Sequence, residues 1–436
     1  MIPQNFATTG FEDWHDIQVT NVPFQETFRA AEEVGMAPGE ASDSAVTTPA
    51  VFDSPTGGAS AVEWEDLAGG RLYSSYDWLR FCATDIGGTT MTGAVHTEDG
   101  AVPVTAIVDE PNSFYQWHTQ LAAKGLPAPS PAGLLVGQRR GYQTHLLTRV
   151  GVSSEKAAAG LLHGVRETAA SLSENPLLPG IGAGPVPAVA SFLTTGDALA
   201  LRAAGVRTTP VLLTTDAWVS VPEGGWAEWL RSLPSKGRRD SVKQEVKAFE
   251  AAGYTLTQAP LSECYAQAAG LLADTQKRYG HPFDLAVLTE SFRLQSVAMG
   301  EKAQVLFAAR PGERPVGFSL FYVHGDTLSV RAVGFDYERL VRGAAEYFNL
   351  VYYASVRIAV ENGLRWIHPG IESPDAKALR GARLRPLWLL DVSEESVLAG
   401  HDAEIRAHNA EKVTELAAIS PAVAKALQTD LFDPFC

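Results

Sequence analysis

The chain has 436 residues, of which 45% are hydrophobic and 19% are charged, so it can bury a sizeable core and is neither a collagen, a coiled coil nor a wholly disordered protein. Because a domain commonly contains roughly 150 residues, we expect two domains. The formal net charge of −15 disfavours a DNA-binding protein, a general nucleic-acid coat and a basic membrane-surface protein.

Residues 1–60 are rich in acidic and small residues and show no sustained helical or strand period, which is typical of an appendage or a linker. From residue 61 onward the pattern is globular, and we expect an N-terminal domain over residues 61–205. Its predicted elements are a helix over 75–82, a strand over 102–108, a helix over 154–171, a Pro- and Gly-rich loop over 176–187, and a strand followed by a helix within 188–204.

Residues 206–436 are expected to form the second domain. Its predicted elements are a strand over 210–219, a short helix over 225–233, a basic helix over 238–249, strands over 304–309, 315–323 and 328–335, a long helix over 344–361, a strand over 365–368, and a helical tail beyond 391. Ser235 can cap the basic helix, and Gly253 can end it in a left-handed conformation. The tight turn His324-Gly-Asp326 predicts an antiparallel hairpin.

The three cysteines, Cys82, Cys264 and Cys436, are far apart and lack metal-site spacing, which is typical of a reduced protein without structural zinc. The chain start has no basic segment followed by an apolar one, and no run of about 18 apolar residues occurs. No spacing of a P-loop, a zinc protease, an α/β-hydrolase or an EF-hand occurs either. We therefore expect a cytoplasmic protein with no metal and no membrane span.

Two basic clusters stand out in this acidic chain. The first lies in the predicted basic helix and the second follows the last short strand; they comprise Lys236, Arg238, Arg239, Lys243 and Lys247, and Lys377, Arg380, Arg383 and Arg385. Taken singly, each cluster is typical of a solvated helix face or loop. If the fold brings both to one cleft, they form a positive site that can bind the phosphates of a polyanionic donor.

Several ordered segments of the second half carry a family resemblance. They are Tyr347-Phe-Asn-Leu-Val-Tyr-Tyr353, Ala359-Val-Glu-Asn-Gly-Leu364, His368-Pro-Gly370, Lys377-Ala-Leu-Arg-Gly381, the basic stretch over 232–245, and Lys277-Arg-Tyr-Gly280. Together they resemble the peptidoglycan-biosynthesis-like N-acyltransferases of the GNAT superfamily, which are cousins of the Fem-type aminoacyl transferases. The resemblance is good over residues 210–390, weak over 61–205, and absent from 1–60.

The resemblance implies an α+β fold of two GNAT-like halves, each a mixed sheet covered by helices, with the active half at the C terminus. It also implies transfer of an acyl or aminoacyl group to an amine, at a gap where two neighbouring strands part and expose backbone donors to the developing oxyanion. The implied co-substrate is aminoacyl-tRNA, which we favour, or acyl-CoA, with no permanently bound cofactor and a small-molecule amine as acceptor. The alternative from another class is a catalytically silent GNAT-fold binding protein.

The chain departs from the family pattern at two places. The loop before the long helix ends as Gly343-Ala-Ala345, but Leu340 stands where acyl-CoA-dependent GNAT enzymes have Arg or Gln, and Arg339 and Arg342 are offset. This departure shifts weight toward a donor other than acyl-CoA. Asn349 and His368 stand where family members commonly have acidic residues.

His368 is the predicted proton acceptor, because an imidazole with an ordinary pKa of ~6.5 accepts a proton near neutrality, although a buried structural histidine is equally compatible. Tyr352 or Tyr353 is predicted to orient the acceptor or the leaving group. Lys377 and Arg380 are predicted to bind or polarise the reacting end of a substrate, with an ordinary ion-paired loop as the alternative. The predicted donor-binding residues are Lys236, Arg238, Arg239, Lys243, Arg339, Arg342 and Gly343.

Overall fold

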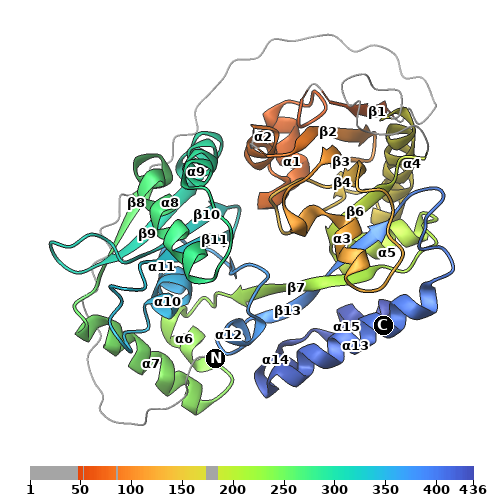
Figure 1. Cartoon of the computed structure of the whole chain (residues 1–436). Helices are drawn as coiled ribbons and strands as arrows, with labels where there is room; N and C mark the ends of the chain where they lie inside the picture. The colour runs from red at the N-terminus through yellow and green to blue at the C-terminus, as the bar shows by residue number, and fades with distance from the viewer. Residues whose placement is uncertain (1–47, 53, 85–86, 173–184) are drawn as a thin grey trace.

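The computed structural model describes residues 48–52, 54–84, 87–172 and 185–436 (Figure 1). Most of the segment predicted to be a linker, and most of the Pro- and Gly-rich loop over 176–187, lie outside these described residues. Within the predicted linker, Thr48–Val51 forms a strand, β1, that pairs with β2. Ordered structure therefore begins before residue 61, and the sequence offered no periodic signal for so short an edge strand.

The first half of the chain contains seven strands and five helices of the α type within its described residues. They are β1 (Thr48–Val51), α1 (Ala61–Ala68), α2 (Tyr76–Thr84), β2 (Thr89–Thr97), β3 (Gly100–Asp109), α3 (Trp117–Ala122), β4 (Gly133–Val136), β5 (Leu147–Thr148), α4 (Ser154–Leu172), β6 (Ala188–Leu193), α5 (Thr195–Ala203) and β7 (Val211–Ser220).

The second half follows directly, and a π-helix, η4, interrupts its central helix. The elements are α6 (Gly225–Ser232), α7 (Lys236–Ala251), β8 (Thr255–Pro260), α8 (Leu261–Arg278), α9 (Leu285–Met299), β9 (Ala303–Ala309), β10 (Gly317–His324), β11 (Thr327–Phe335), α10 (Glu346–Phe348), η4 (Asn349–Tyr353), α11 (Ala354–Glu361), β12 (Trp366–His368), α12 (Pro374–Ala378), β13 (Arg383–Asp391), α13 (Asp402–Ile419), α14 (Pro421–Ala426) and α15 (Thr429–Phe432).

Local sequence signals explain the elements that surround the later site. The hydroxyl of Ser235 accepts a hydrogen bond from the backbone N–H of Arg238 at 3.1 Å, which starts α7 where the cap was predicted. Gly253 has a φ of +77° at the end of α7, also as predicted. The predicted hairpin is formed by β10 and β11, with His324 opposite Thr327. The predicted positions of five further elements are confirmed within one or two residues; they are α2, α4, β6, β7 and β12.

The predicted long helix differs in two respects. It begins at Glu346 rather than at Ala344, because Ala345 adopts a left-handed conformation with a φ of +58°. It is also not a uniform α-helix, since the backbone N–H of Ala354 donates to the carbonyl of Asn349, five residues back. Such single π-turns frequently lie at functional sites, and no hydrophobic period reveals them in advance.

The same order of elements occurs twice. A strand, two helices, three strands, a helix, a strand, a helix and a strand describe both the run from β1 to β7 and the run from β8 to β13, apart from short extra elements. Each run contains one parallel pair among antiparallel neighbours, β4 with β6 and β11 with β12. This arrangement confirms the α+β class with two GNAT-like halves, each a mixed sheet covered by helices.

The last strands of the two halves are exchanged. Strand β7 closes the first run but pairs antiparallel with β12 of the second half, at Val219 opposite Ile367, while β13 pairs antiparallel with β6 of the first. The exchanged strands also pair with each other along most of their length. Apart from β5, which pairs with β3, the described strands follow one path, β1-β2-β3-β4-β6-β13-β7-β12-β11-β10-β9-β8. Strands β7 and β13 span the region between the two halves in Figure 1.

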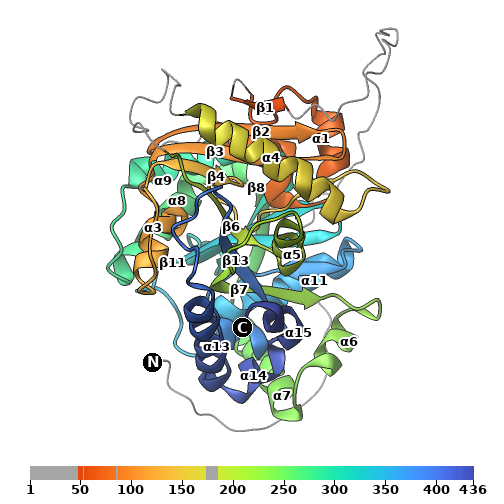
Figure 2. The ribbon, with the colours of Figure 1, turned by 90° about the vertical axis from the view of Figure 1, so that its right-hand side faces the viewer.

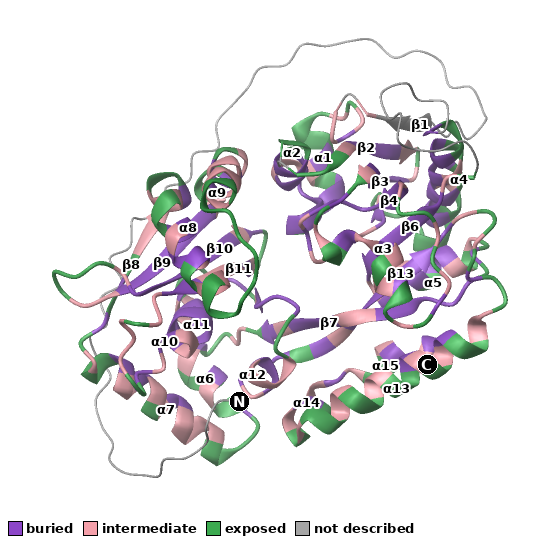
Figure 3. Cartoon of the chain, in the orientation of Figure 1, coloured by how far each residue is buried: buried purple, intermediate pink, exposed green. Residues whose placement is uncertain are grey.

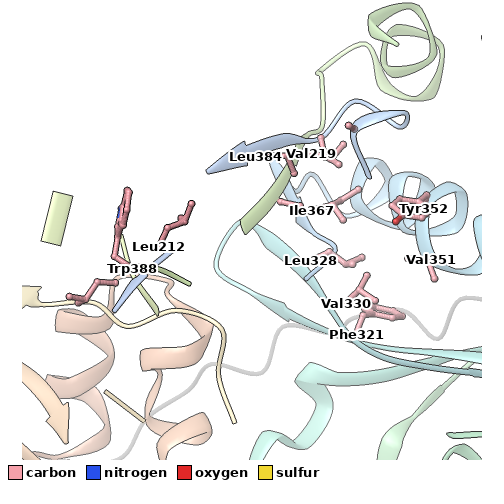
Figure 4. Packing of buried hydrophobic residues seen from close by; sticks show 14 of the residues in the cluster. Leu212, Val219, Phe321, Leu328, Val330, Val351, Tyr352, Ile367, Leu384 and Trp388 are labelled. Carbon is pink, nitrogen blue, oxygen red and sulfur yellow. The ribbon is translucent and has the colours of Figure 1, made fainter. Parts of the chain in front are cut away.

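Helices cover the faces of this sheet and leave its strands buried. Figure 2 shows α4 across β2, β3 and β4, and α13 lies against β7. The strands are mostly buried, whereas α7, α9, α13 and α14 expose one face (Figure 3). One hydrophobic cluster passes from the first half into the second along the exchanged strands; its members in Figure 4 include Leu212, Val219, Phe321, Leu328, Val330, Val351, Tyr352, Ile367, Leu384 and Trp388.

Trp388 of β13 provides a test of this junction. Its fully buried ring packs against Phe432 and Phe435, and its Nε1–H donates to the hydroxyl of Thr195 at 3.0 Å. Trp388→Ala should lower the free energy of unfolding by about 3–5 kcal/mol, because it leaves a large cavity. Urea denaturation measures this loss, and Val62→Ala, at a side chain 73% exposed, is the control with a change below about 0.5 kcal/mol. Equal stability of both variants would contradict the role of the junction.

Candidate functional site

The parallel strands β11 and β12 part soon after they meet. Their register pairs Thr327 with Trp366 and ends with Ser329 opposite His368. Strand β12 stops there, and Gly370 turns the chain away with a φ of +81°, whereas β11 continues to Phe335. The gap that the family resemblance implied therefore opens at His368. Unpaired backbone groups at such a gap can donate to an oxyanion.

His368 is held at this gap by a buried carboxylate from β7. The Nε2 of His368 lies 2.5 Å from Oδ1 of Asp216, and both side chains are almost fully buried. The other oxygen, Oδ2, accepts hydrogen bonds from Nε2 of Gln143 at 2.7 Å and from Nε1 of Trp218 at 2.6 Å. Burial alone would raise the pKa of Asp216, but the neighbouring His368 and these hydrogen bonds bring it below its ordinary value.

The second nitrogen of His368 is available for chemistry. Since the Asp216 carboxylate accepts a hydrogen bond from Nε2–H, the neutral imidazole carries its lone pair on Nδ1. Among the described residues no group forms a hydrogen bond with this buried Nδ1. Three aromatic rings surround the imidazole; the ring centroids lie at 5.0 Å for Trp218, 6.1 Å for Tyr73 and 6.4 Å for Tyr142. This is the arrangement of a general base oriented by a carboxylate.

Lys377 of α12 lies close enough to Asp216 for the two charges to interact. Its Nζ approaches the backbone of Gly370, and its side chain is buried. Burial lowers the pKa of Lys377 to about 7, although Asp216 and Glu372 pull it upward. An amine with this pKa exchanges a proton near neutrality, so it can stabilise a negative charge in one form and accept a proton in the other.

The remaining predicted catalytic residues belong to a second cluster. Arg380 is buried and donates to a carboxylate oxygen of Glu245 on α7 at 3.0 Å, and its Cζ lies 3.5 Å from the ring centroid of Phe348. The hydroxyl of Tyr353 donates to the same carboxylate oxygen of Glu245. The ring of Tyr352 lies beside the guanidinium at 5.3 Å. The fold thus divides the predicted residues, with His368 and Lys377 around Asp216 and the other three around Glu245.

Helix α7 lies against this second cluster. Asn349 donates from its amide to the backbone carbonyl of Glu245 at 3.1 Å, and Arg238 lies 3.8 Å from the Glu245 carboxylate. A pocket of about 710 Å³ opens beside the start of α7, between α12 and α14. Its lining includes Arg238 and Lys425. Of the other predicted donor-binding residues on α7, Lys236 is exposed, and Arg239 and Lys243 are partly exposed.

The loop between β11 and α10 holds the other predicted donor-binding residues. Arg339 forms ion pairs with Asp336 at 3.5 Å and Glu313 at 3.6 Å, whereas Arg342 and Gly343 are exposed. The buried carboxylate of Glu346 accepts from the backbone N–H of Val341 at 2.8 Å. In an acyl-CoA-dependent enzyme this loop would bind a pyrophosphate. Here the Glu346 carboxylate already accepts one of the backbone N–H groups of the loop.

Sequence reasoning missed Asp216, Gln143 and Trp218. Asp216 carried a signal, because a carboxylate inside an apolar strand is buried only when it has partners. Gln143 lies in a loop of the weakly matching half, and no local pattern connects it with β12. The described residues contain no group of three or more metal-ligating side chains, and none of their helices has the length and hydrophobicity to span a membrane.

The repeated order of elements and the parted strands agree with the GNAT-like fold that the family resemblance implied. A family model for FemAB-like proteins, described as peptidoglycan biosynthesis/recognition, matches residues 190–422. Because this match spans more than half of the chain, the protein belongs to the FemAB-like family. This result confirms the resemblance found in the sequence.

Several solved structures resemble this chain at low sequence identity. The crystal structure of FemX is similar with a TM-score of 0.50 and 12% identity, covering 77% of this chain and 96% of FemX. L-PGS from Bacillus licheniformis has a TM-score of 0.42 and 10% identity, covering 79% and 96% of the two chains. A GCN5-related N-acetyltransferase from Kribbella flavida has a TM-score of 0.30 and 11% identity, covering 77% and 71%. The likeness to FemX concerns the fold alone, and no curated protein sequence matches the chain.

The lowered pKa of Lys377 predicts a pH-dependent stability. Between the folded pKa of about 7 and the ordinary value of 10.5, the unfolded chain binds one more proton at this residue than the folded chain. The free energy of unfolding should therefore rise with pH across this window, by at most about 5 kcal/mol. Urea denaturation of the wild type and of Lys377→Met between pH 6.5 and pH 10 isolates the contribution. Curves that stay parallel at every pH would exclude a shifted lysine.

Loss of the Arg380–Glu245 ion pair should lower the free energy of unfolding. Arg380→Ala leaves the Glu245 carboxylate without its buried partner and should destabilise the protein by about 3 kcal/mol. Arg365→Ala is the matched control, because that arginine is 75% exposed and lies 3.6 Å from Asp326, and an exposed pair contributes less than about 1 kcal/mol. Denaturation midpoints compare the two variants. An Arg380→Ala loss no larger than that of the control would contradict this role of the pair.

Proposed function

We propose that this protein is an amide-forming aminoacyltransferase that moves an aminoacyl group from aminoacyl-tRNA to the amine of a small molecule. The observation that carries the proposal is the His368 imidazole at the gap between β11 and β12, oriented by Asp216 through Nε2 and with its buried Nδ1 free of any hydrogen bond among the described residues. Membership in the FemAB-like family supports a transferase of this kind. The identity of the donor and that of the acceptor belong to the proposal.

The transfer requires one proton acceptor and one oxyanion site. The neutral amine of the acceptor attacks the ester carbonyl of the aminoacyl-tRNA, and a C–N bond forms while the carbonyl oxygen becomes an oxyanion. Nδ1 of His368 takes the proton of the attacking nitrogen. The C–O bond to the ribose then breaks, and His368 returns the proton to the departing ribose oxygen. Asp216 stabilises the imidazolium between these two steps, so the chain ends in its starting protonation state.

The other predicted residues assist around this step. In its protonated form Lys377 can stabilise the oxyanion, and its pKa of about 7 keeps that form populated at neutral pH. In this proposal Arg380 and Tyr353, which contact Glu245 of α7, and Tyr352, which lies beside Arg380, are positioning residues. The basic residues of α7 and the pocket beside Arg238 and Lys425 would contact phosphates of the tRNA.

Acyl-CoA is the alternative donor, and one observation weighs against it. The Glu346 carboxylate already accepts the Val341 backbone N–H, and a pyrophosphate at that loop would meet a like charge. The hydroxyl of Tyr254 lies 3.2 Å from the same backbone nitrogen, and burial together with Glu346 raises the pKa of Tyr254 to about 12. One backbone donor of the loop is therefore already occupied by internal partners, which supports aminoacyl-tRNA as the donor.

A donor assay tests the proposal directly. The purified chain is given a panel of amines, including amino acids, amino sugars and a cell-wall precursor, together with either charged total tRNA or a set of acyl-CoA thioesters. Amide product that forms from charged tRNA and is abolished by ribonuclease is the expected result. Product from a thioester that ribonuclease does not affect would select the acyl-CoA alternative. Binding of a donor without any product would select the catalytically silent protein.

Substitutions of His368 and Asp216, the hydrogen-bonded dyad, should each lower turnover, by different amounts. His368→Gln should lower turnover at least about 100-fold, because glutamine cannot accept the proton. Asp216→Asn should lower turnover on the order of 10³-fold, because an amide that donates to Nε2 places the imidazole proton on Nδ1. Turnover at several pH values gives both results. A His368→Gln protein with a normal rate and profile would dismiss the base.

A further inference from the structure

Arg331 occupies an irregular position in β11. The register with β10 passes from Val330 opposite Phe321 to Ala332 opposite Leu320, so Arg331 is the extra residue of a β-bulge. Bulges re-aim a side chain and are common beside active sites. Strand β12 pairs with β11 only as far as Ser329, and the bulge therefore lies at the gap beside His368.

The Arg331 side chain is held by rings from the first half. Its Cζ lies 4.7 Å from the ring centroid of Tyr142 and 5.4 Å from that of Trp78. No carboxylate forms an ion pair with Arg331, and no hydrogen bond to it occurs, within the part of the chain that the structure describes. The residue is also partly exposed. Stacking thus fixes the guanidinium and leaves its five N–H groups available to a ligand.

Two further donors next to Arg331 have no partner. The hydroxyl of Tyr73 and the Nε1–H of Trp78 are buried, and neither forms a hydrogen bond among the described residues. The ring of Tyr73 lies 5.1 Å from Trp78, 5.5 Å from Tyr142 and 6.1 Å from His368. Burial raises the pKa of Tyr73 well above its ordinary value, so it remains a phenol that can donate. The cluster therefore combines the positive charge of Arg331 with two hydrogen-bond donors, from Tyr73 and Trp78, that have no partner among the described residues.

We propose that Arg331 binds a carboxylate of the acceptor, so that the acceptor is an amine that also carries a carboxylate. The planar guanidinium presents two parallel N–H groups that match the two oxygens of a carboxylate. Tyr73 and Trp78 supply the additional donors around it. The acceptor then lies between both halves of the protein, with its amine directed to Nδ1 of His368. This inference rests on the proposed function and names the class of its acceptor.

Paired amines test the carboxylate without requiring turnover. Binding to the full chain is measured by calorimetry and by tryptophan fluorescence for lysine against cadaverine and muramic acid against glucosamine, because within each pair only one member carries the carboxylate. Phosphoethanolamine against ethanolamine is the phosphate arm. For at least one carboxylate pair, the acidic member should bind the wild type at least 10-fold more tightly. Arg331→Gln should reduce that preference to less than 2-fold.

Two variants control the measurement. Arg331→Lys retains the charge without the bidentate fork and should keep part of the preference, and urea denaturation shows that each variant is folded. Arg365→Gln removes an exposed arginine that precedes β12 and should leave binding unchanged. Equal binding within both carboxylate pairs, binding of no carboxylated amine, or a preference that survives Arg331→Gln would overturn the proposal. A preference confined to phosphoethanolamine would overturn the assignment to a carboxylate.

The transfer assay separates this inference from the proposed function. With charged tRNA, Arg331→Gln should raise the KM for the acceptor at least 10-fold and leave the KM for the tRNA unchanged. Transfer to amines irrespective of a carboxylate would retain the aminoacyltransferase and remove the Arg331 site. Carboxylate binding that depends on Arg331, without transfer from any donor, would retain the site and remove the enzyme.

Discussion

The pairing of β7 with β13 is the constraint on which the candidate site depends. Asp216 belongs by sequence to the first half, whereas His368 ends a strand of the second. The two side chains meet only because β7 crosses to pair with β12, next to the place where β12 separates from β11. Strand β13 fixes this crossing from the other side, where Arg385 stands opposite Asp216 in the register. The exchange of strands therefore assembles the dyad as well as the sheet.

A buried carboxylate at this position requires compensation, and the structure supplies it from three directions. An unpaired charge in a protein interior is strongly unfavourable, but Asp216 accepts hydrogen bonds from Gln143, Trp218 and His368. Gln143 comes from a loop of the first half, Trp218 from β7 itself, and His368 from the second half. Because the three donors come from different parts of the chain, the orientation of the His368 imidazole depends on how the two halves pack together. The same packing places Tyr142 beside both His368 and Arg331.

The sequence predicted a part of this structure, whereas helices α8 and α9 and strands β2, β8 and β13 were not predicted. Strands β9 to β12, the cap at Ser235 and the hairpin turn follow from local patterns, and the family motifs located His368 and Lys377. The site depends on contacts that no local pattern encodes. Gln143 and Asp216 are 73 residues apart, and Asp216 and His368 are 152 apart. The bulge at Arg331 and the π-turn at Asn349 depend on packing and leave the hydrophobic period almost unchanged. Arg380 matched a family motif, yet its partner Glu245 lies on a helix that had been considered only for its positive charge.

The exchanged strands also have a consequence for biosynthesis. Strand β6 is synthesised long before its neighbour β13, which is the last strand of the described chain, so β6 has an unpaired edge while the residues between them are made. Unpaired edges attract other strands, and contacts between distant segments form slowly. The nascent first half is thus an incomplete sheet that needs either protection by a chaperone or a rapid arrival of the remaining chain. The strand exchange unites the two halves in the native protein. Until β13 has been synthesised, however, the same exchange leaves the edge of β6 open to aggregation.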